Sequence, residues 1–329
     1  MTTGTVQVER IGIEGQQQYS QEPFPLALAC HSPATLDRAT AWVAEHRRLL
    51  CTQARLHGAI LFRGFPLTGP EDFDGFIAAF DLLNFPYEES LSNAVRVIRT
   101  PRVFTANEAP ATVRILLHHE MAQTPLYPSK LFFFCEQPAE SGGATPLCRS
   151  DVLWDRFRAE CPGFARNCET KGLKYSNVMP SQSDPSSGMG RSWQSTLRAS
   201  TPQEAEERLQ RLGYSWTWLA DGCLRATTPV LPAVRKLPDG RTSFFNQLIA
   251  AFQGWKDERN EPSNAITFGD GTPLDPDAVS LAARLGEELS FDVRWRRADV
   301  VLVDNYVTMH GRRGFTGTRK VLASLIGGE

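Results

Sequence analysis

Apolar residues recur along the chain with two different periods, and each period predicts a different kind of element. Five stretches have helical apolar spacing, and two of them open on clear cap residues, Thr35 and the pair Ser150-Asp151. The five stretches are residues 35–56, 70–83, 150–160, 202–212 and 276–289. Between them lie short β-rich segments bounded by glycine, proline and asparagine. The pattern predicts a mainly β fold with flanking helices, arranged as an antiparallel jelly roll.

Two of the strand-like segments lead to residues that can bind a metal. Val113, Ile115 and Leu117 occupy alternate positions just before His118, which predicts a strand. The apolar run of residues 300–306 predicts a buried strand whose far end delivers His310.

The tripeptide His118-His119-Glu120 is the most specific chemical feature of the sequence. In a strand, residues two apart share a face, so His118 and Glu120 would project into one cavity while His119 points away. With His310 they would form a facial triad of two imidazoles and one carboxylate. Such a triad leaves three metal positions open, which suits non-heme Fe(II) enzymes.

The other histidines are expected to be structural. His31, His46 and His57 lie in helical or loop segments with no carboxylate at ligand spacing, and His119 would point away from the cavity. Any single histidine is more often a core or surface residue than a ligand. The prediction therefore depends on the set of three and not on one member.

The chain shows no repeat, low-complexity block or long linker, which predicts a single catalytic domain over residues 1–329. An elaborated insert is expected at about residues 170–265. Residues 176–193 are rich in proline and glycine and are interpreted as a flexible lid, with an ordinary mobile loop as an equal alternative. Gly188 and Gly190 have no strand before them and no third glycine, so they are not a dinucleotide-binding motif.

Composition excludes several classes of function. The 329 residues are 41% hydrophobic with a net charge of −2, as in a soluble globular protein, and the scattered lysines and arginines exclude a nucleic-acid partner. The longest apolar runs are too short for a membrane span, and the first 15 residues are polar, so a cytoplasmic location is expected. Seven cysteines without a Cys-x-x-Cys motif predict free thiols in a reducing compartment.

Around the metal motif the sequence resembles the Fe(II)/2-oxoglutarate-dependent dioxygenases of the taurine dioxygenase (TauD/TfdA) superfamily. The resemblance spans roughly residues 58–327 and implies a cupin-like double-stranded β-helix. Glu120, where other branches have aspartate, is similar to the clavaminate synthase-like branch, and the surrounding sequence is most similar to its SyrP-like subgroup, named after the syringomycin-pathway aspartate hydroxylase. The segments that carry the resemblance are residues 117–121, 130–135, 137–139, 142–146, 245–247, 269–271, 304–305, 310–312 and 315–319.

The resemblance implies roles for five residues. His118, Glu120 and His310 would bind Fe(II). Thr145 would donate a hydrogen bond to the far carboxylate of the cosubstrate 2-oxoglutarate, and Arg319 would pair with the same carboxylate. A guanidinium suits this role because it offers two parallel, charge-assisted hydrogen bonds, which an ammonium cannot.

Arg312 and Arg313 are rivals for the role of Arg319. We prefer Arg319 because it adjoins the strand-like residues that follow it, which would place it inside the barrel. The chain also departs from the family pattern at Ala298, where relatives usually have glycine, and at Gly314, where they usually have proline. Both departures affect turn geometry and neither affects a ligand.

The resemblance implies that O2 and 2-oxoglutarate are consumed while a C–H bond of a small substrate is hydroxylated. The intact Glu120 carboxylate argues against halogenation, whereas desaturation or cyclisation are alternative outcomes of the same chemistry. Relatives act on free or carrier-protein-tethered amino acids in specialised metabolism, so an amino-acid-like substrate is expected. The candidate substrate contacts are Arg99, Arg102, Asn107, Gln123 and Tyr127.

Two functions of other classes remain open. A zinc hydrolase also uses two histidines, a carboxylate and one water, but it has no need of both Thr145 and Arg319. A non-catalytic jelly-roll binding protein would be expected to have lost a metal ligand, and none is missing from the sequence.

Overall fold

Strands from both ends of the sequence pair in the largest sheet of the molecule. The structure, a computed structural model, describes residues 6–31, 35–261 and 265–327. All neighbours in this first sheet pair antiparallel except β4 and β5, which are parallel. Its strand order is β1 (Val8–Arg10), β4 (Leu26–Cys30), β5 (Ala59–Arg63), β18 (Val300–Asp304), β8 (Lys130–Gln137), β21 (Lys320–Ile326) and β6 (Phe104–Thr105).

A second, four-stranded antiparallel sheet shares its core with the first. Phe133 and Val301 of the first sheet belong to the same buried cluster as Leu147 and Phe291 of the second. The two sheets therefore pack against each other through their inner faces. The order of the second sheet is β17 (Ser290–Val293), β10 (Thr145–Arg149), β19 (Thr308–Arg312) and β7 (Ile115–His118).

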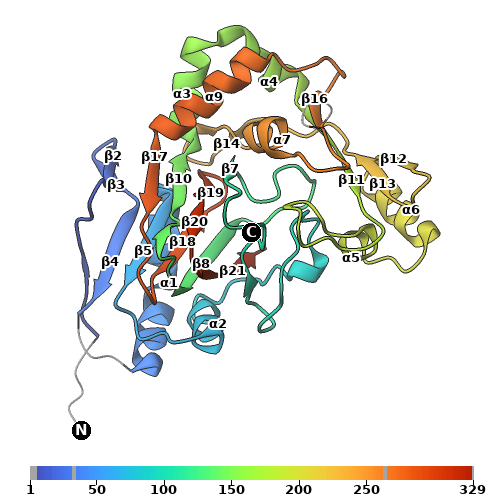
Figure 1. The fold of residues 1–329 in the computed structure, drawn as a ribbon. Coiled ribbons are helices and arrows are strands. Elements are labelled where there is room, and N and C mark those ends of the chain that lie inside the picture. The colour runs from blue at the N-terminus through green and yellow to red at the C-terminus, as the bar shows by residue number, and fades with distance from the viewer. Residues whose placement is uncertain (1–5, 32–34, 262–264, 328–329) are drawn as a thin grey trace.

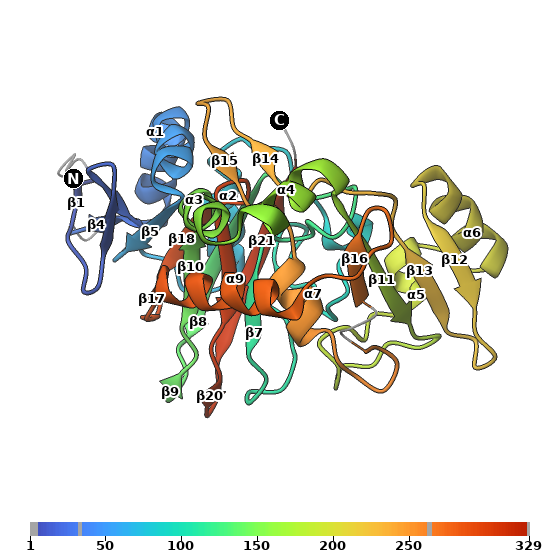
Figure 2. The ribbon, with the colours of Figure 1, turned by 90° about the horizontal axis from the view of Figure 1, so that it is seen from above.

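Helices cover the outer faces of both sheets (Figures 1 and 2). On the first sheet, Phe132 and Phe134 of β8 alternate with the inward Phe133 and pack outward in the cluster that includes α1 (Leu36–His57) and α2 (Pro70–Ala78). Successive side chains of β8 thus point to opposite faces of the sheet and belong to two different hydrophobic clusters.

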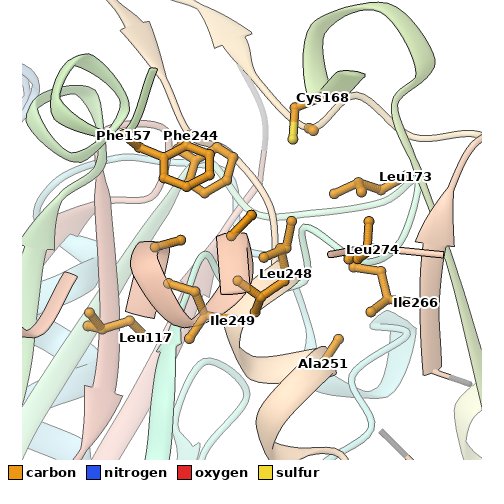
Figure 3. Close-up of a cluster of buried hydrophobic side chains, with 14 of the residues drawn as sticks. Leu117, Phe157, Cys168, Leu173, Phe244, Leu248, Ile249, Ala251, Ile266 and Leu274 are labelled. Carbon is orange, nitrogen blue, oxygen red and sulfur yellow. The ribbon is translucent and has the colours of Figure 1, made fainter. Parts of the chain in front are cut away.

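The outer face of the second sheet packs against a helical layer. Leu117 and Met309 contribute to this cluster from β7 and β19, and Figure 3 shows Leu117 in the cluster with Leu248 and Ile249. The helices are α3 (Ser150–Glu160), α4 (Pro162–Lys171), α7 (Leu248–Gly254) and α9 (Pro276–Glu288).

A third sheet lies beside these layers and forms the right-hand part of Figure 1. It consists of β12 (Ser215–Trp218), β13 (Leu224–Thr227), β11 (Leu173–Met179) and β16 (Ile266–Phe268), with α5 (Trp193–Leu197) and α6 (Pro202–Arg211). Leu173 and Tyr175 of β11 belong to the same buried cluster as the helical layer. The remaining elements are β2 (Gln17–Tyr19), β3 (Glu22–Phe24), the 3-10 helix η1 (Tyr87–Glu89), β9 (Ser141–Gly142), β14 (Arg235–Lys236), β15 (Thr242–Ser243) and β20 (Phe315–Thr316).

All five predicted helices are present, and one is shorter than expected. The helix predicted over residues 70–83 ends at Ala78, because the chain turns there and Asp81 adopts a left-handed conformation with φ of +56°. Ser150 is the first residue of α3 and not its cap; its hydroxyl contacts His119 instead. Within the described ranges, no helix has the length and apolar character needed to cross a bilayer.

The predicted lid is partly regular structure. Its first residues, 176–179, belong to β11 and pair with β13, so the expectation of a loop is wrong there. The irregular part covers residues 180–192. Polar contacts connect this part to the rest of the protein, including an ion pair between Asp184 and Arg259 at 2.9 Å.

Candidate metal centre

The two candidate histidine ligands face each other across neighbouring strands. His310 of β19 pairs in register with His118 at the end of β7, and their ring centroids are 4.4 Å apart. His310 therefore lies in the middle of its own strand and not at the end of β18, as the sequence suggested. The chain leaves β18 in a turn after Asp304, whose side chain accepts a hydrogen bond from the Tyr306 N–H, and then returns as β19.

Glu120 reaches the same cavity from a turn. The strand ends at His118, so the predicted strand alternation does not continue to Glu120. Asn305 fixes the turn instead: its Oδ1 accepts a hydrogen bond from the Glu120 N–H at 2.8 Å, and its Nδ2 donates to the Glu120 carbonyl at 3.0 Å. Met121 then adopts φ of +58°. Asn305 is a positioning residue that the sequence analysis missed.

His119 points away from this cavity and is satisfied elsewhere. Its Nδ1 lies at hydrogen-bond distance from the Asn305 carbonyl, and its Nε2 lies 2.8 Å from the Ser150 hydroxyl. Burial lowers the pKa of His119 to about 3. These contacts agree with the structural role expected for this residue.

The three candidate ligands converge closely enough to hold one metal ion. Each offers an atom within 4.8 Å of the others, and His310 Nε2 is 3.6 Å from Glu120 Oε2. His118 Nδ1 is bound to the Leu116 carbonyl at 2.7 Å, which leaves its Nε2 for a metal. Imidazole nitrogens with a carboxylate oxygen are a donor set that suits iron, so the residues fit the expected ion.

Electrostatics keeps His118 and Glu120 in their metal-binding forms. Burial, together with the neighbouring His310, lowers the pKa of His118 to about 4. Burial alone would raise the pKa of Glu120, but the Arg96 guanidinium and His310 hold it well below its ordinary value. At neutral pH the site therefore presents a neutral imidazole at His118 and a carboxylate at Glu120, as metal ligation requires.

One wall of the cavity carries the predicted cosubstrate residues. Arg319, next to the start of β21, donates from Nη2 to Thr145 Oγ1 at 3.3 Å and from Nε to the Gly143 carbonyl at 2.8 Å. Thr145 Oγ1 also accepts from Trp295 Nε1 at 3.1 Å, so its own proton remains available for a ligand. Burial and the neighbouring Arg312 lower the pKa of Arg319 to about 10.

The rival arginines are already occupied. Arg312 donates to backbone carbonyls of residues 107, 109, 110 and 113 and so holds a loop in place. Arg313 pairs with Glu287 and Asp292. Among the described residues, Arg319 has no acid within ion-pair distance, which leaves its charge for a ligand.

Two of the five candidate substrate contacts line the cavity, and three do not. Asn107 and Gln123 line the cavity that also holds His118, Glu120, Thr145, His310 and Arg319. Three others are outside its lining and have partners: Arg99 lies 3.9 Å from Glu136, Arg102 lies 2.9 Å from Asp74, and the Tyr127 hydroxyl accepts from Arg235 at 3.0 Å. The prediction for these three fails on position, because their side chains turn to partners away from the cavity.

Arg96 is a cavity residue that the sequence analysis missed. Its Nη2 lies 3.2 and 3.1 Å from the two carboxylate oxygens of Glu120, and its side chain is only 7% exposed. Nothing in the local sequence separates it from Arg99 and Arg102, because the difference depends on how an irregular segment turns toward the metal ligands.

A fold of two packed sheets around a centre of two imidazoles and one carboxylate defines a class, the mononuclear non-heme iron dioxygenases. Within it, the chain belongs to the TauD/TfdA family: the model described as "Taurine catabolism dioxygenase TauD, TfdA family" matches residues 22–325. The enzyme accordingly depends on Fe(II) and 2-oxoglutarate and consumes O2.

Two curated relatives cover most of the chain. A clavaminate synthase-like protein of Arabidopsis thaliana is 39% identical over 320 residues, which are 95% of this chain and 96% of the relative. The dapdiamide synthesis protein DdaC of Enterobacter agglomerans is 28% identical over 284 residues, 82% of each chain.

Solved structures support the fold alone. PvcB of Pseudomonas aeruginosa superposes with a TM-score of 0.55 at 16% identity, covering 100% of this chain and 94% of PvcB. AAD-2, crystallised with Mn(II) and N-oxalylglycine, gives a TM-score of 0.51 at 15% identity and 98% coverage of both chains.

Proposed function

We propose that the protein couples oxidative decarboxylation of 2-oxoglutarate to hydroxylation of a C–H bond in a small, amino-acid-like substrate. His118, Glu120 and His310 hold Fe(II), and Thr145 and Arg319 hold the far carboxylate of 2-oxoglutarate. The observation that carries the proposal is that the three candidate ligands line one cavity with Arg319, a partly buried arginine that has no acidic partner in the described part of the chain. A site for a metal alone has no need of that arginine.

When bound, the iron supplies the chemistry that activates O2 and attacks the C–H bond. The protein supplies position and electrostatics. Thr145 donates a hydrogen bond and Arg319 two charge-assisted hydrogen bonds to the same carboxylate, so the keto-acid end of the cosubstrate is aimed at the metal. Glu120 remains a carboxylate ligand, which supports hydroxylation over halogenation; desaturation or cyclisation is the alternative outcome.

The proposed architecture is a single catalytic domain over residues 1–329. Its two packed sheets are the halves of a double-stranded β-helix, or jelly roll, that holds the metal between them. The insert of about residues 170–265 contributes the strands β11, β12 and β13 of the third sheet, and its irregular segment of residues 180–192 serves as a lid. The lid is supported by Gly188 and Met189, which line the cavity, and by the contact of Asn107 with the Gly188 carbonyl.

The substrate class is inferred from the relatives. DdaC is named for dapdiamide synthesis, and a PvcB structure is titled as an oxygenase from an isonitrile synthetic pathway. Both names refer to specialised metabolism, so we propose that this enzyme acts in such a pathway. Its substrate is a small molecule, free or presented by a carrier protein. A cytoplasmic location stays a prediction from the sequence.

The test is anaerobic titration of the apoprotein with Fe(II) and then 2-oxoglutarate, monitored by the weak visible charge-transfer absorption of a chelated keto acid. We expect the absorption in the wild type and in His31→Gln, a control at an exposed histidine. His118→Ala and Glu120→Ala should lose it, together with consumption of 2-oxoglutarate in air.

Three results would contradict the proposal. Bound iron without the absorption would favour a zinc-type hydrolase, and the absence of specific metal binding would favour a non-catalytic binding protein. Retention of the full absorption by both alanine variants would show that the metal binds elsewhere.

A further inference from the structure

Arg96 is a buried cation whose hydrogen-bonding capacity is only partly used. Its guanidinium packs over the Phe104 ring at 5.3 Å, and one nitrogen, Nη2, contacts both oxygens of Glu120. Its Nε is buried without a hydrogen-bond partner. Within the described ranges, Glu120 is the only acid in ion-pair distance of Arg96, so this cation depends on a residue that the metal also needs.

The charges around the cavity are unequal. Among the described residues that line the cavity, Glu120 is the only carboxylate, whereas Arg96, Arg312 and Arg319 all contribute guanidinium groups; the side chains of Arg96 and Arg312 are buried and Arg319 is partly buried. Arg114 also lines the cavity, but it pairs with Glu287 at 3.0 Å. A divalent metal and the 2-oxoglutarate dianion bring no net charge between them. The loaded cavity therefore retains a surplus of positive charge, which is costly unless an anion enters.

Metal binding would weaken the ion pair between Arg96 and Glu120. A carboxylate that ligates a divalent cation shares its charge with that ion, so Glu120 becomes a weaker partner for Arg96. Arg319 is assigned to the cosubstrate by the function proposed above, and Arg312 already donates to backbone carbonyls. Arg96 is then the arginine that lies next to the metal ligands and whose positive charge is only partly balanced by Glu120.

We propose that Arg96 binds a carboxylate of the substrate and thereby determines specificity; this inference rests on the function proposed above. The planar guanidinium can offer Nε and a terminal nitrogen as parallel donors, which match the two oxygens of a carboxylate. Gln123 Oε1, buried without a partner in the same lining, supplies an acceptor for an ammonium group nearby. The substrate is thus a free amino acid and not an aminoacyl group tethered through its carboxylate.

The experiment uses the full chain loaded anaerobically with Fe(II) and 2-oxoglutarate. The probes are the twenty proteinogenic L-amino acids, small mono- and dicarboxylic acids, and the corresponding amides, each tested for a shift of the charge-transfer absorption. In the wild type we expect at least one free acid to bind about 10- to 100-fold tighter than its amide, as a charge-assisted bidentate contact would give. Arg96→Gln should keep the absorption and lose this preference.

Two further variants make the result specific. Arg96→Lys keeps a cation beside Glu120 without the planar fork, so it should fold like the wild type and retain only a weak preference for the acid. Arg158→Gln, at an exposed arginine paired with Asp155, should retain the full preference. Should Arg96→Gln fail to fold, the comparison of Arg96→Lys with the wild type decides the question.

The outcomes separate this inference from the proposed function. An absorption in the wild type with no response to any free acid, or with equal affinity for acid and amide, would overturn the role of Arg96 and leave the oxygenase intact. Loss of the absorption in Arg96→Gln would make Arg96 a support for Glu120 and would also overturn its role in substrate binding. Absence of the absorption from the wild type itself would mean that the proposed function has failed.

Discussion

At the scale of single residues, the arginines near the candidate metal ligands differ chiefly in the groups that accept hydrogen bonds from them. Arg313 has two acids, Arg312 has backbone carbonyls, and Arg319 has a hydroxyl and one carbonyl. The sequence placed Arg319 next to a strand, and that position follows from local periodicity. The environments of the three depend on long-range contacts that no local pattern contains.

We predict that Arg319→Lys raises the 2-oxoglutarate concentration needed for half-maximal turnover by about 10- to 100-fold, the worth of a bidentate charge-assisted pair. Lysine keeps the charge and loses the planar pair of donors. Affinity for Fe(II) should change little, because Arg319 contacts no candidate ligand. Steady-state assays of 2-oxoglutarate consumption and anaerobic iron titration measure the two quantities.

Arg313→Lys is the matched control for this prediction, because Arg313 makes its ion pairs outside the cavity lining. Its cosubstrate requirement should stay at the wild-type value. An unchanged requirement in Arg319→Lys would assign the far carboxylate of 2-oxoglutarate to another residue.

At the scale of elements, periodicity predicted which residues are buried more reliably than where strands end. The apolar run of residues 300–306 was interpreted as one strand, yet Asn305 in its interior is the clamp that ends β18 and fixes the turn of Glu120. A buried asparagine within an apolar run was an available signal. Its partners could not be predicted, because Glu120 lies 185 positions away in the sequence.

The close pairing of β7 and β19 gives a prediction at this scale. A Cβ at Gly311, the residue after His310, would lie 2.5 Å from the Ile115 carbonyl of β7, so that strand would have to move. Since β7 carries His118, Gly311→Ala should weaken Fe(II) binding at least tenfold and lower the free energy of unfolding by about 1–3 kcal/mol. Iron titration and denaturant unfolding provide the measurements.

Gly314→Ala serves as the control, because its Cβ would meet nothing closer than 3.7 Å. We expect its stability to stay within about 0.5 kcal/mol of the wild type. Equal iron affinities in the two variants would show that the spacing of β7 and β19 does not position the ligands.

At the scale of the whole molecule, the site is built where three distant segments meet. The turn of residues 119–121, the strand β19 and the irregular segment around Arg96 come from separate parts of the chain. Four of the five predicted helices cover the outer faces of the two main sheets, and the fifth, α6, lies beside the third sheet. Two of the three candidate ligands could be proposed from the sequence because His118 and Glu120 share a short motif. The surplus of positive charge in the cavity could not be predicted, because Arg96 contacts Glu120 only in the folded chain.

Burial of neutral histidines makes the stability of the apoprotein depend on pH. The folded-state pKa values of His118 and His119 are about 4 and about 3, below the ordinary value of 6.5. Between pH 6.5 and 4 the unfolded chain therefore binds protons that the folded chain does not, so the free energy of unfolding falls as the pH falls through this window. Each histidine contributes up to about 1.4 kcal/mol per pH unit.

His118→Gln should remove about one proton from this dependence. Guanidinium unfolding of the metal-free wild type and variant at pH 7, 6 and 5 measures both slopes. If the slope in His118→Gln equals that of the wild type, burial does not hold His118 neutral. Other groups would then cause the pH dependence of the free energy of unfolding.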